Sequence, residues 1–275
     1  ADALKDAEAA LASTSSVPYS SAAVSKPTFI DIEDASWMWG ILITDKDRVS
    51  TTGICNFPSH MGSLNYGYAS VGGWRRISPK LYNQIPESDV RKGWFLDDTG
   101  VSVNLPAAAQ AYITKKGAPV YTQVKYGPMN DEWGSNNNAT DVILMRVEEM
   151  YLIKAEAQAM NNDVSGGVNT LNSFVNTYRD PSYKCTATTG EAVQEAVWHQ
   201  RRIEFWGEGL AYFDIMRLNK GVNRLGCGFP KTAVFNIAAG DPVQIYSIPN
   251  KEVQYNPLLE NNPLVSAPTP IPDEE

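Results

Sequence analysis

Consecutive helical segments in the second half of the chain constrain the fold more than any other feature of the sequence does. Between Asp141 and Met160 apolar residues recur at helical spacing on two faces, so this helix is expected to be largely buried. One face carries Leu144, Val147, Tyr151 and Ala155, and the other carries Met150, Ile153 and Ala157. A second helix ends before Pro181 and has its apolar face at Val168, Leu171, Val175 and Tyr178. We expect these two helices to form an antiparallel hairpin.

A second pair of helices follows this hairpin. The third helix is expected to start near Thr188, because Thr188 and Glu191 have the spacing of a capping box, and the glycines at 207 and 209 loosen its end. The fourth covers 210–218 and stops at 219–221, where Asn and Gly are typical of a helix C-terminus. Two consecutive helix pairs are typical of helical repeat proteins, although the chain shows no internal repeat of that period.

The region before these helices, residues 25–138, lacks sustained helical periodicity. It is rich in Gly, Pro, Ser and aromatic residues and contains most of the tryptophans. Two runs, 37–43 and 118–126, have the composition of short strands. We therefore expect long irregular loops with a few strands, and the polar run at 134–141 marks the change to the helices.

The N-terminal residues are also predicted to be helical, over 1–11, with Leu4, Ala7 and Leu11 on one face. Acidic residues stand where a signal peptide needs basic ones, so this segment is not a signal peptide. The chain starts at Ala1 with no capping residue before the helix, and we expect it to be part of a longer protein. The expected regions are 1–24, a helix and linker left from a missing N-terminal half, 25–138, the irregular region, and 139–275, the helices and a Pro-rich tail.

The charge of the chain excludes one class of partner. Lys and Arg number 23 and Asp and Glu number 31, which gives a net charge of −8, and the positive residues form no stripe. Nucleic-acid binding needs clustered positive charge, so it is not expected. Apolar runs are also too short to cross a bilayer.

Cysteine and histidine are too few and too scattered for the common metal and nucleophile sites. Cys55, Cys185 and Cys227 form no CxxC pair and are odd in number, so neither a zinc ribbon nor a disulfide scaffold is indicated. The two histidines, His60 and His199, are far apart in sequence. We expect no metal, no cofactor and no catalytic residue.

Three ordered blocks of sequence resemble the SusD/RagB family of the Bacteroidetes outer membrane. They are RVEEMYLIKAEAQAM at 146–160, HQRRIEFWGEGLAYFDIMRLNKG at 199–221 and IPNKEVQYNPLLENNP at 248–263. Segments 77–95 and 123–126 are also similar to that family. The resemblance implies a mainly α fold of tetratricopeptide-like helical hairpins, with long irregular, aromatic-rich loops and a few short strands.

The resemblance also implies a function. Proteins of this family are lipid-anchored at the cell surface and bind oligosaccharides or polysaccharides without catalysis, then deliver them to a SusC-like TonB-dependent transporter. The implied location is the outer membrane, with the lipid anchor outside this chain, since its three cysteines are internal. The alternatives are a glycoside hydrolase or other sugar-active enzyme, and a helical scaffold that binds a peptide or protein.

Candidate sugar contacts come from the residues themselves, because the family has no fixed sugar-binding motif. Sugars stack on aromatic rings, and amide, carboxylate and guanidinium groups bind their hydroxyls. Segment 57–76 offers such groups among its glycines, and the predicted contacts are Asn65, Tyr66, Tyr68, Trp74 and Arg75, with Trp39 outside the segment. The competing interpretation is that these rings hold a long loop on the helices.

The other tryptophans favour packing. Trp37 and Trp39 are two apart in a predicted strand and are expected on the same face. Trp198 and Trp206 fall at i and i+8 of the third helix and are predicted core residues, whereas Trp94 fits either role.

The charged residues of the helices are interpreted as structural ion pairs. Arg201 and Glu204 have the i, i+3 spacing of an intrahelical pair, and Arg202 follows. Glu149 and Glu156 are expected to pair with an arginine of a neighbouring helix. The adjacent acids of the chain make poor glycosidase dyads, since neighbouring side chains point apart: Asp97–Asp98, Asp131–Glu132 and Glu148–Glu149.

Overall fold

The computed structural model describes residues 1–47, 50 and 56–273, and the chain divides into two compact units. The first comprises residues 1–77 and 81–208, and the second comprises 78–80 and 209–275. The units divide after residue 208 and not at 138, the boundary that composition suggests. The helices within 147–204 and the irregular region belong to the same unit. Cys55 lies outside the described residues.

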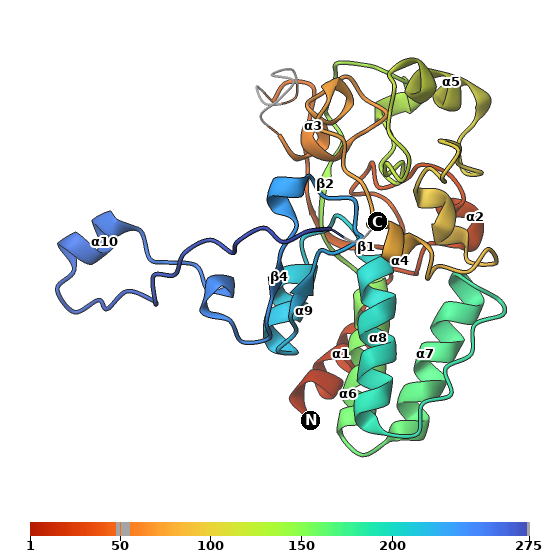
Figure 1. Cartoon of the computed structure of the whole chain (residues 1–275). Helices are drawn as coiled ribbons and strands as arrows, with labels where there is room; N and C mark the ends of the chain where they lie inside the picture. Colours follow the sequence, from red (N-terminus) through yellow and green to blue (C-terminus); the bar gives the residue numbers. More distant parts are fainter. Residues whose placement is uncertain (48–49, 51–55, 274–275) are drawn as a thin grey trace. The chain divides into compact units, whose positions relative to one another are not determined.

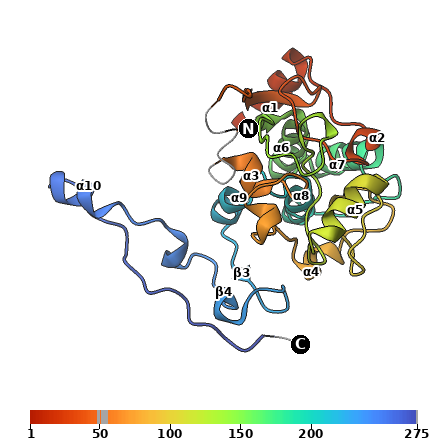
Figure 2. The same ribbon diagram turned by 90° about the horizontal axis from the view of Figure 1, so that it is seen from above.

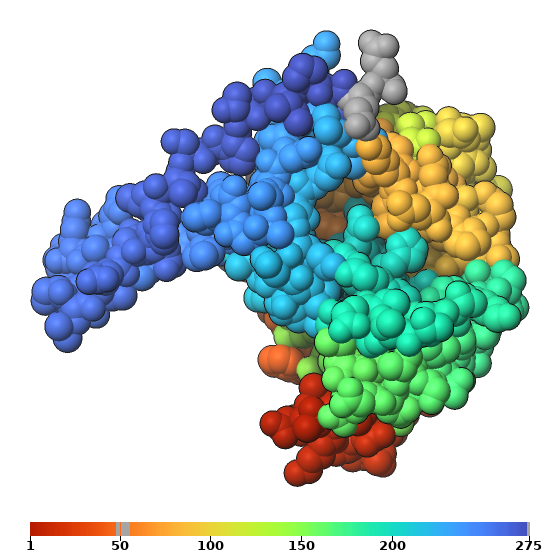
Figure 3. All heavy atoms as spheres, turned by 60° about the horizontal axis from the view of Figure 1, so that its bottom comes forward, coloured from red at the N-terminus to blue at the C-terminus, as the bar shows by residue number. Residues whose placement is uncertain are grey.

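Four helices form the regular part of the first unit: α1 (Asp2–Ser13), α6 (Val147–Met160), α7 (Val164–Tyr178) and α8 (Gly190–Glu204). Helix α6 packs against the other three, and Figures 1 and 2 show it among them. Figure 3 shows the α6–α7 hairpin, in green, beside α1 in red. The predicted hairpin and the mainly helical fold are thus confirmed.

Small residues bring these helices close together. A Cβ atom on Gly167 of α7 would lie 2.6 Å from the carbonyl oxygen of Ala155, and one on Gly190 of α8 would lie 2.9 Å from that of Ala159. Glycine is therefore required where α7 and α8 meet α6.

The start of α8 is one residue later than predicted, since the hydroxyl of Thr189, rather than Thr188, caps it by accepting from the Ala192 amide at 3.2 Å.

The helix predicted from Asp141 is wrong over its first turn. Residues Val142–Arg146 form strand β2, which pairs antiparallel with β1 (Trp37–Ile41), and α6 begins only at Val147. The run VILM fits either period, and pairing with β1 decides in favour of the strand. Leu144 is consequently exposed instead of sharing the buried face of α6.

The prediction that Trp37 and Trp39 share a face is also wrong. Trp37 is buried in the core, whereas Trp39 is 63% exposed. The register of β1 against β2 shifts between these two residues, and such a bulge breaks the alternation of a regular strand. Trp206 lies beyond the end of α8 and is partly buried against the core, as its predicted packing role requires.

The irregular region contains short helices joined by loops. They are α3 (Phe57–Met61), α4 (Pro79–Tyr82), α5 (Ala107–Lys115) and the 3₁₀ turns η1 (Ala69–Val71), η2 (Val90–Trp94) and η3 (Met129–Asp131), and α2 (Ser21–Val24) comes just before the region. The predicted strand at 118–126 is instead a turn at 120–121 followed by isolated bridges, from Thr122 to Arg76, Gln123 to Phe95 and Tyr126 to Thr28. Trp94 is fully buried in the core.

The second unit contains α9 (Ala211–Arg217), the two-stranded sheet of β3 (Val222–Asn223) and β4 (Asn236–Ile237), the 3₁₀ turns η4 (Lys231–Ala233) and η5 (Pro242–Gln244), and α10 (Asn250–Tyr255). The predicted fourth helix is thus confirmed as α9. Tyr246, Tyr255 and Leu258 are largely exposed. Helices of the described chain are all too short or too polar to cross a membrane.

Candidate functional site

The segment with the predicted sugar contacts, residues 57–76, is called here the tyrosine loop. It runs from α3 through η1 and presents two tyrosine rings to solvent, Tyr66 at 48% exposure and Tyr68 at 43%. Exposed aromatic rings on a fixed loop are the surfaces on which sugar rings stack. The tyrosine loop therefore has the main feature expected of a carbohydrate site.

Buried polar contacts fix the backbone beneath these rings. The Asn65 amide donates to Oδ1 of Asn138 at 3.0 Å, and the Asn65 carbonyl accepts from the hydroxyl of Tyr112 at 3.1 Å. The Tyr66 amide donates to the carbonyl of Ser135 at 2.8 Å. Asn65 is only 1% exposed, so it anchors the loop instead of offering its amide at the surface.

Tyr68 lies in a small cluster of rings and cations. The ring of His60 stacks on Tyr68 with centroids 4.7 Å apart, and the Arg75 guanidinium lies 5.6 Å from the centroid of the Tyr68 ring. Arg75 also donates to the Gly73 carbonyl at 2.8 Å and contacts Nδ1 of His60 at 3.3 Å. A Cβ on Gly73 would lie 2.6 Å from the Tyr68 ring, so the glycine makes room for that ring.

Tyr66 is accompanied by a lysine. Nζ of Lys116, which follows α5, lies 5.3 Å from the centroid of Tyr66 and 5.7 Å from that of Tyr112. Tyr66 and Tyr68 thus lie on the same loop with separate neighbouring cations, Lys116 for Tyr66 and Arg75 for Tyr68. Trp74 is half-buried against the cluster around Leu64 and Ile113, and Trp39 lies apart from the loop, on β1.

A second group of charged residues lies in the interior, and it is called here the Glu204 cluster. Its four cations are Arg91, Lys125, Arg146 and Arg179, and its four carboxylates are Asp89, Glu148, Glu204 and Glu208. Glu204 is at its centre and accepts from Arg146 at 2.6 Å, from Arg179 at 2.8 Å and from Arg91 at 3.0 Å. The sequence indicated a structural role for Glu204 but not these partners.

Electrostatics keep the Glu204 cluster ionised. Burial would raise the pKa of Glu204, but the charges of Arg179 and Arg146 outweigh it and hold this pKa well below its usual range. Burial lowers the pKa of Lys125 to about 8 in spite of Glu208, whose carboxylate lies 2.5 Å from Nζ. Matched charges and full burial are typical of a structural network.

The remaining predicted ion-pair residues also make contacts between elements. Glu149 of α6 accepts from Arg201 of α8 at 3.1 Å, and Glu156 accepts from Gln194 at 2.8 Å. Arg202 lies over the ring of Trp198, 5.6 Å from its centroid. These contacts join α6 to α8 and stabilise α8 itself.

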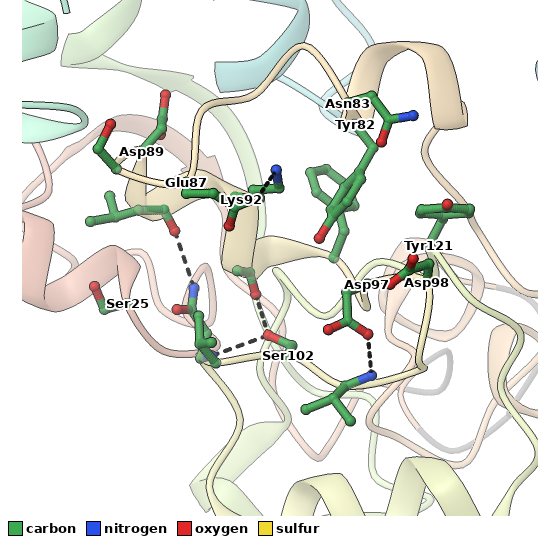
Figure 4. Close-up of a pocket in the computed structure, with 17 residues that line it drawn as sticks. Ser25, Tyr82, Asn83, Glu87, Asp89, Lys92, Asp97, Asp98, Ser102 and Tyr121 are labelled. Atoms are coloured by element: carbon green, nitrogen blue, oxygen red, sulfur yellow. Dashed lines mark hydrogen bonds and ion pairs between the residues drawn. The ribbon is translucent and has the colours of Figure 1, made fainter. Parts of the chain in front are cut away.

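A third feature was missed by sequence reasoning: a pocket of about 490 Å³, called here the Tyr82 pocket (Figure 4). Its walls come from Ser25, residues between 82 and 104, and Tyr121. Burial, together with Asp97 and Glu87, raises the pKa of Tyr82 to about 12, so its hydroxyl remains a hydrogen-bond donor. Asp97 and Asp98 were noted only as adjacent acids, and no motif in the sequence links them to the tyrosines.

No group of three or more His, Cys, Asp and Glu side chains in the described residues is arranged to hold a metal. Of the cysteines in that part of the chain, Cys185 is a buried free thiol and Cys227 a half-buried one.

Comparisons with known proteins give one consistent family. The model of the SusD family matches residues 91–264. A SusD superfamily protein of Bacteroides thetaiotaomicron has a TM-score of 0.71 and 21% identity, covering 96% of this chain and 57% of its own. A SusD-like carbohydrate binding protein of Bacteroides vulgatus matches with a TM-score of 0.61 and 22% identity. The match covers 90% of this chain and 45% of that protein. Surface glycan-binding protein A of Bacteroides thetaiotaomicron matches with a TM-score of 0.59 and 17% identity. The match covers 94% of this chain and 58% of that protein.

These matches show the fold, and the chain spans about half the length of the solved structures. No curated protein matches the chain.

Proposed function

This chain belongs to the SusD family, and from that premise we propose that it binds oligosaccharides or polysaccharides at the bacterial cell surface, through the tyrosine loop. The observation that carries the proposal is the exposure of Tyr66 and Tyr68 on a loop whose backbone is fixed from below by Asn65. The names of two similar structures, a carbohydrate binding protein and a surface glycan-binding protein, support it.

The groups around the two rings suit a sugar. The apolar C–H face of a pyranose ring stacks on Tyr66 or Tyr68, and the guanidinium of Arg75 and the ammonium of Lys116 donate hydrogen bonds to its hydroxyls. Because the loop is already held in place, binding orders few additional side chains. A fixed loop of this kind favours affinity without a conformational change.

The proposed role is binding without catalysis. A glycosidase needs a carboxylic acid with a raised pKa next to a second carboxylate. Partial burial would raise the pKa of Asp97, but hydrogen bonds from Thr99 and Val101 outweigh it and hold that pKa below its usual range. Glu204 and Glu148 are enclosed in the Glu204 cluster, away from any substrate.

Family membership also supports the rest of the proposal. The bound glycan is passed to a SusC-like TonB-dependent transporter, and a lipid anchor holds the protein at the outer membrane. Membership supports this role because the longer solved proteins that the chain resembles share its fold.

A polysaccharide panel tests the proposal. We would measure binding by the whole chain and by Tyr66→Ala and Tyr68→Ala, and assay the same mixtures for released reducing sugar. Each substitution should weaken binding about twofold to tenfold, because one aromatic contact contributes roughly 0.5–1.5 kcal/mol. Tyr255→Ala is the matched control, since Tyr255 is an exposed tyrosine on α10, outside the loop.

The outcomes separate the alternatives. Unchanged affinity in both loop variants would remove the tyrosine loop from the proposal. Release of reducing sugar would replace binding by a glycosidase activity, and an absence of binding to every glycan would favour the peptide scaffold.

A further inference from the structure

The Tyr82 pocket is walled by aromatic rings. Tyr82 and Tyr121 contact each other with centroids 5.1 Å apart, and Phe95 meets Tyr82 edge to face at 6.5 Å. At about 490 Å³ the pocket falls in the size range of small-ligand sites. It is therefore large enough for a sugar residue. Phe95 is 1% exposed and Tyr82 8%, and Nζ of Lys92 lies over the Tyr82 ring, 5.0 Å from its centroid, so the partly exposed ring of Tyr121 is the surface on which such a residue stacks.

Tyr121 is held rigidly at the wall of this pocket. Its φ of 65° is unusual for a bulky residue and has to be enforced by the surrounding structure. The Tyr121 amide donates to the Leu96 carbonyl and its carbonyl accepts from the Ile77 amide, both at 3.0 Å. The backbone at Tyr121 is consequently fixed at this wall of the pocket.

The floor of the pocket is also pre-formed. The hydroxyl of Ser102 donates to the Gly93 carbonyl at 2.6 Å, and the amide of Asn104 donates to that hydroxyl at 3.1 Å. The side chain of Asn104 donates to the Val24 carbonyl at 3.1 Å. These bonds tie the floor to the helices, so little ordering is needed on binding.

The charge of the pocket is negative. Lys92 is already neutralised by Glu87, with Nζ and Oε1 2.5 Å apart, and it also donates to the Ile85 carbonyl. Asp97 accepts the bonds from Thr99 and Val101 at Oδ1, and Figure 4 shows its other oxygen pointing away from the Val101 amide. Asp98 is exposed at the rim. Two carboxylates thus lack a compensating cation among the lining residues.

We propose that the Tyr82 pocket is a second carbohydrate subsite, which binds an amino sugar or a neutral sugar and rejects uronic acids and sulfated sugars. The ring of Tyr121, backed by the buried ring of Tyr82, supplies the stacking surface, and Asp97 and Asp98 accept from hydroxyl or ammonium groups. This inference rests on the proposed function. The pocket differs in charge from the tyrosine loop, because the cations Arg75 and Lys116 lie beside the rings of that loop.

The test uses three β-1,4-linked trisaccharides that differ in one substituent: glucosamine, glucose and glucuronic acid trimers. Affinities of the whole chain are measured by calorimetry. We expect the glucosamine trimer to bind about tenfold more tightly than the glucuronate trimer, as partly exposed charges in contact allow. The glucose trimer should lie between them.

The variant that isolates the pocket is Asp97→Asn with Asp98→Asn. Asparagine keeps the Oδ1 acceptor for Thr99 and Val101, so the turn is retained, and thermal melting checks this. The spread between the trimers should shrink to about twofold or less, with the glucose trimer little changed. Asp2→Asn with Asp6→Asn on α1 removes the same charge elsewhere and should leave the spread intact.

The outcomes distinguish this inference from the proposed function. A spread that persists in Asp97→Asn with Asp98→Asn overturns the pocket while glycan binding stands. So does a glucuronate trimer that binds as well as the glucosamine trimer when the rings of the tyrosine loop are removed by Tyr66→Ala with Tyr68→Ala. If Tyr66→Ala with Tyr68→Ala keeps both the affinity and the spread, the pocket is supported and the tyrosine loop is not.

Discussion

Replacing Glu204 by glutamine tests whether the interior of the first unit depends on charge as well as on packing. The substitution keeps the size of the side chain but removes the charge that faces Arg91, Arg146 and Arg179. The cluster would then hold four cations against three carboxylates. The amide nitrogen of glutamine would also point a donor at guanidinium groups that can only donate.

The magnitude follows from the burial of these groups. Glu204 and its three arginines are almost entirely enclosed, so water cannot compensate the lost charge. Breaking a buried pair by removing one partner costs about 3–5 kcal/mol. For a unit of about 200 residues this corresponds to a melting temperature lower by roughly 6–20 °C.

The assay is thermal and urea unfolding followed by circular dichroism. Glu8→Gln is the control, because Glu8 pairs with Lys154 at 3.2 Å on the exposed side of α1 and should cost only about 0.2–1 kcal/mol. A Glu204→Gln protein with the same melting temperature as Glu8→Gln would contradict this expectation. It would mean that the arginines find other acceptors at little cost.

Two further predictions concern acid and the tyrosine loop. The folded protein holds the pKa of Glu204 well below its ordinary value of 4.5, so as the pH falls the unfolded chain takes up this proton first. The contribution of Glu204 to the free energy of unfolding is therefore complete above about pH 4.5 and is lost as the pH is lowered further. Urea unfolding at pH 7 and pH 3.5 should show a smaller loss for Glu204→Gln than for the native protein, and equal losses would contradict this. Gly73→Ala would place a Cβ atom 2.6 Å from the Tyr68 ring and 2.9 Å from the Tyr68 carbonyl oxygen, so the ring must move, and glycan binding should weaken about twofold to tenfold. Binding equal to that of the native protein would mean that the orientation of Tyr68 is unimportant.

Periodicity predicted the helices well, because the apolar residues on the buried face of a helix recur at a regular spacing within one segment of the chain. Helices α6, α7 and α9 lie close to where apolar spacing placed them. The error at Val142–Arg146 arose because a short apolar run satisfies both periods, and only its pairing with β1 decides between them. The exposure of Trp39 likewise depends on a bulge, which is a property of two strands and not of one.

The candidate sites were predicted less completely, because they join distant segments. Exposed Tyr66 and Tyr68 were expected from their glycine-rich surroundings, but the burial of Asn65 depends on Asn138 and Tyr112. The Tyr82 pocket requires Tyr121, which is brought to it by hydrogen bonds to Leu96 and Ile77. Spacing along one chain carries no signal for such contacts.

The Glu204 cluster connects stability to the sites. Arg91 lies in η2, which is followed directly by Phe95 and Asp97 of the Tyr82 pocket, and Lys125 lies four residues after Tyr121. Glu204 at the end of α8 pairs with Arg91, and Glu208 pairs with Lys125. Since the helices and the irregular region share these charges, the rigid helices fix the segments that form the pocket. The unusual φ of Tyr121 can therefore be maintained, because the strain in one loop residue is opposed by a network anchored in α7, α8 and β2.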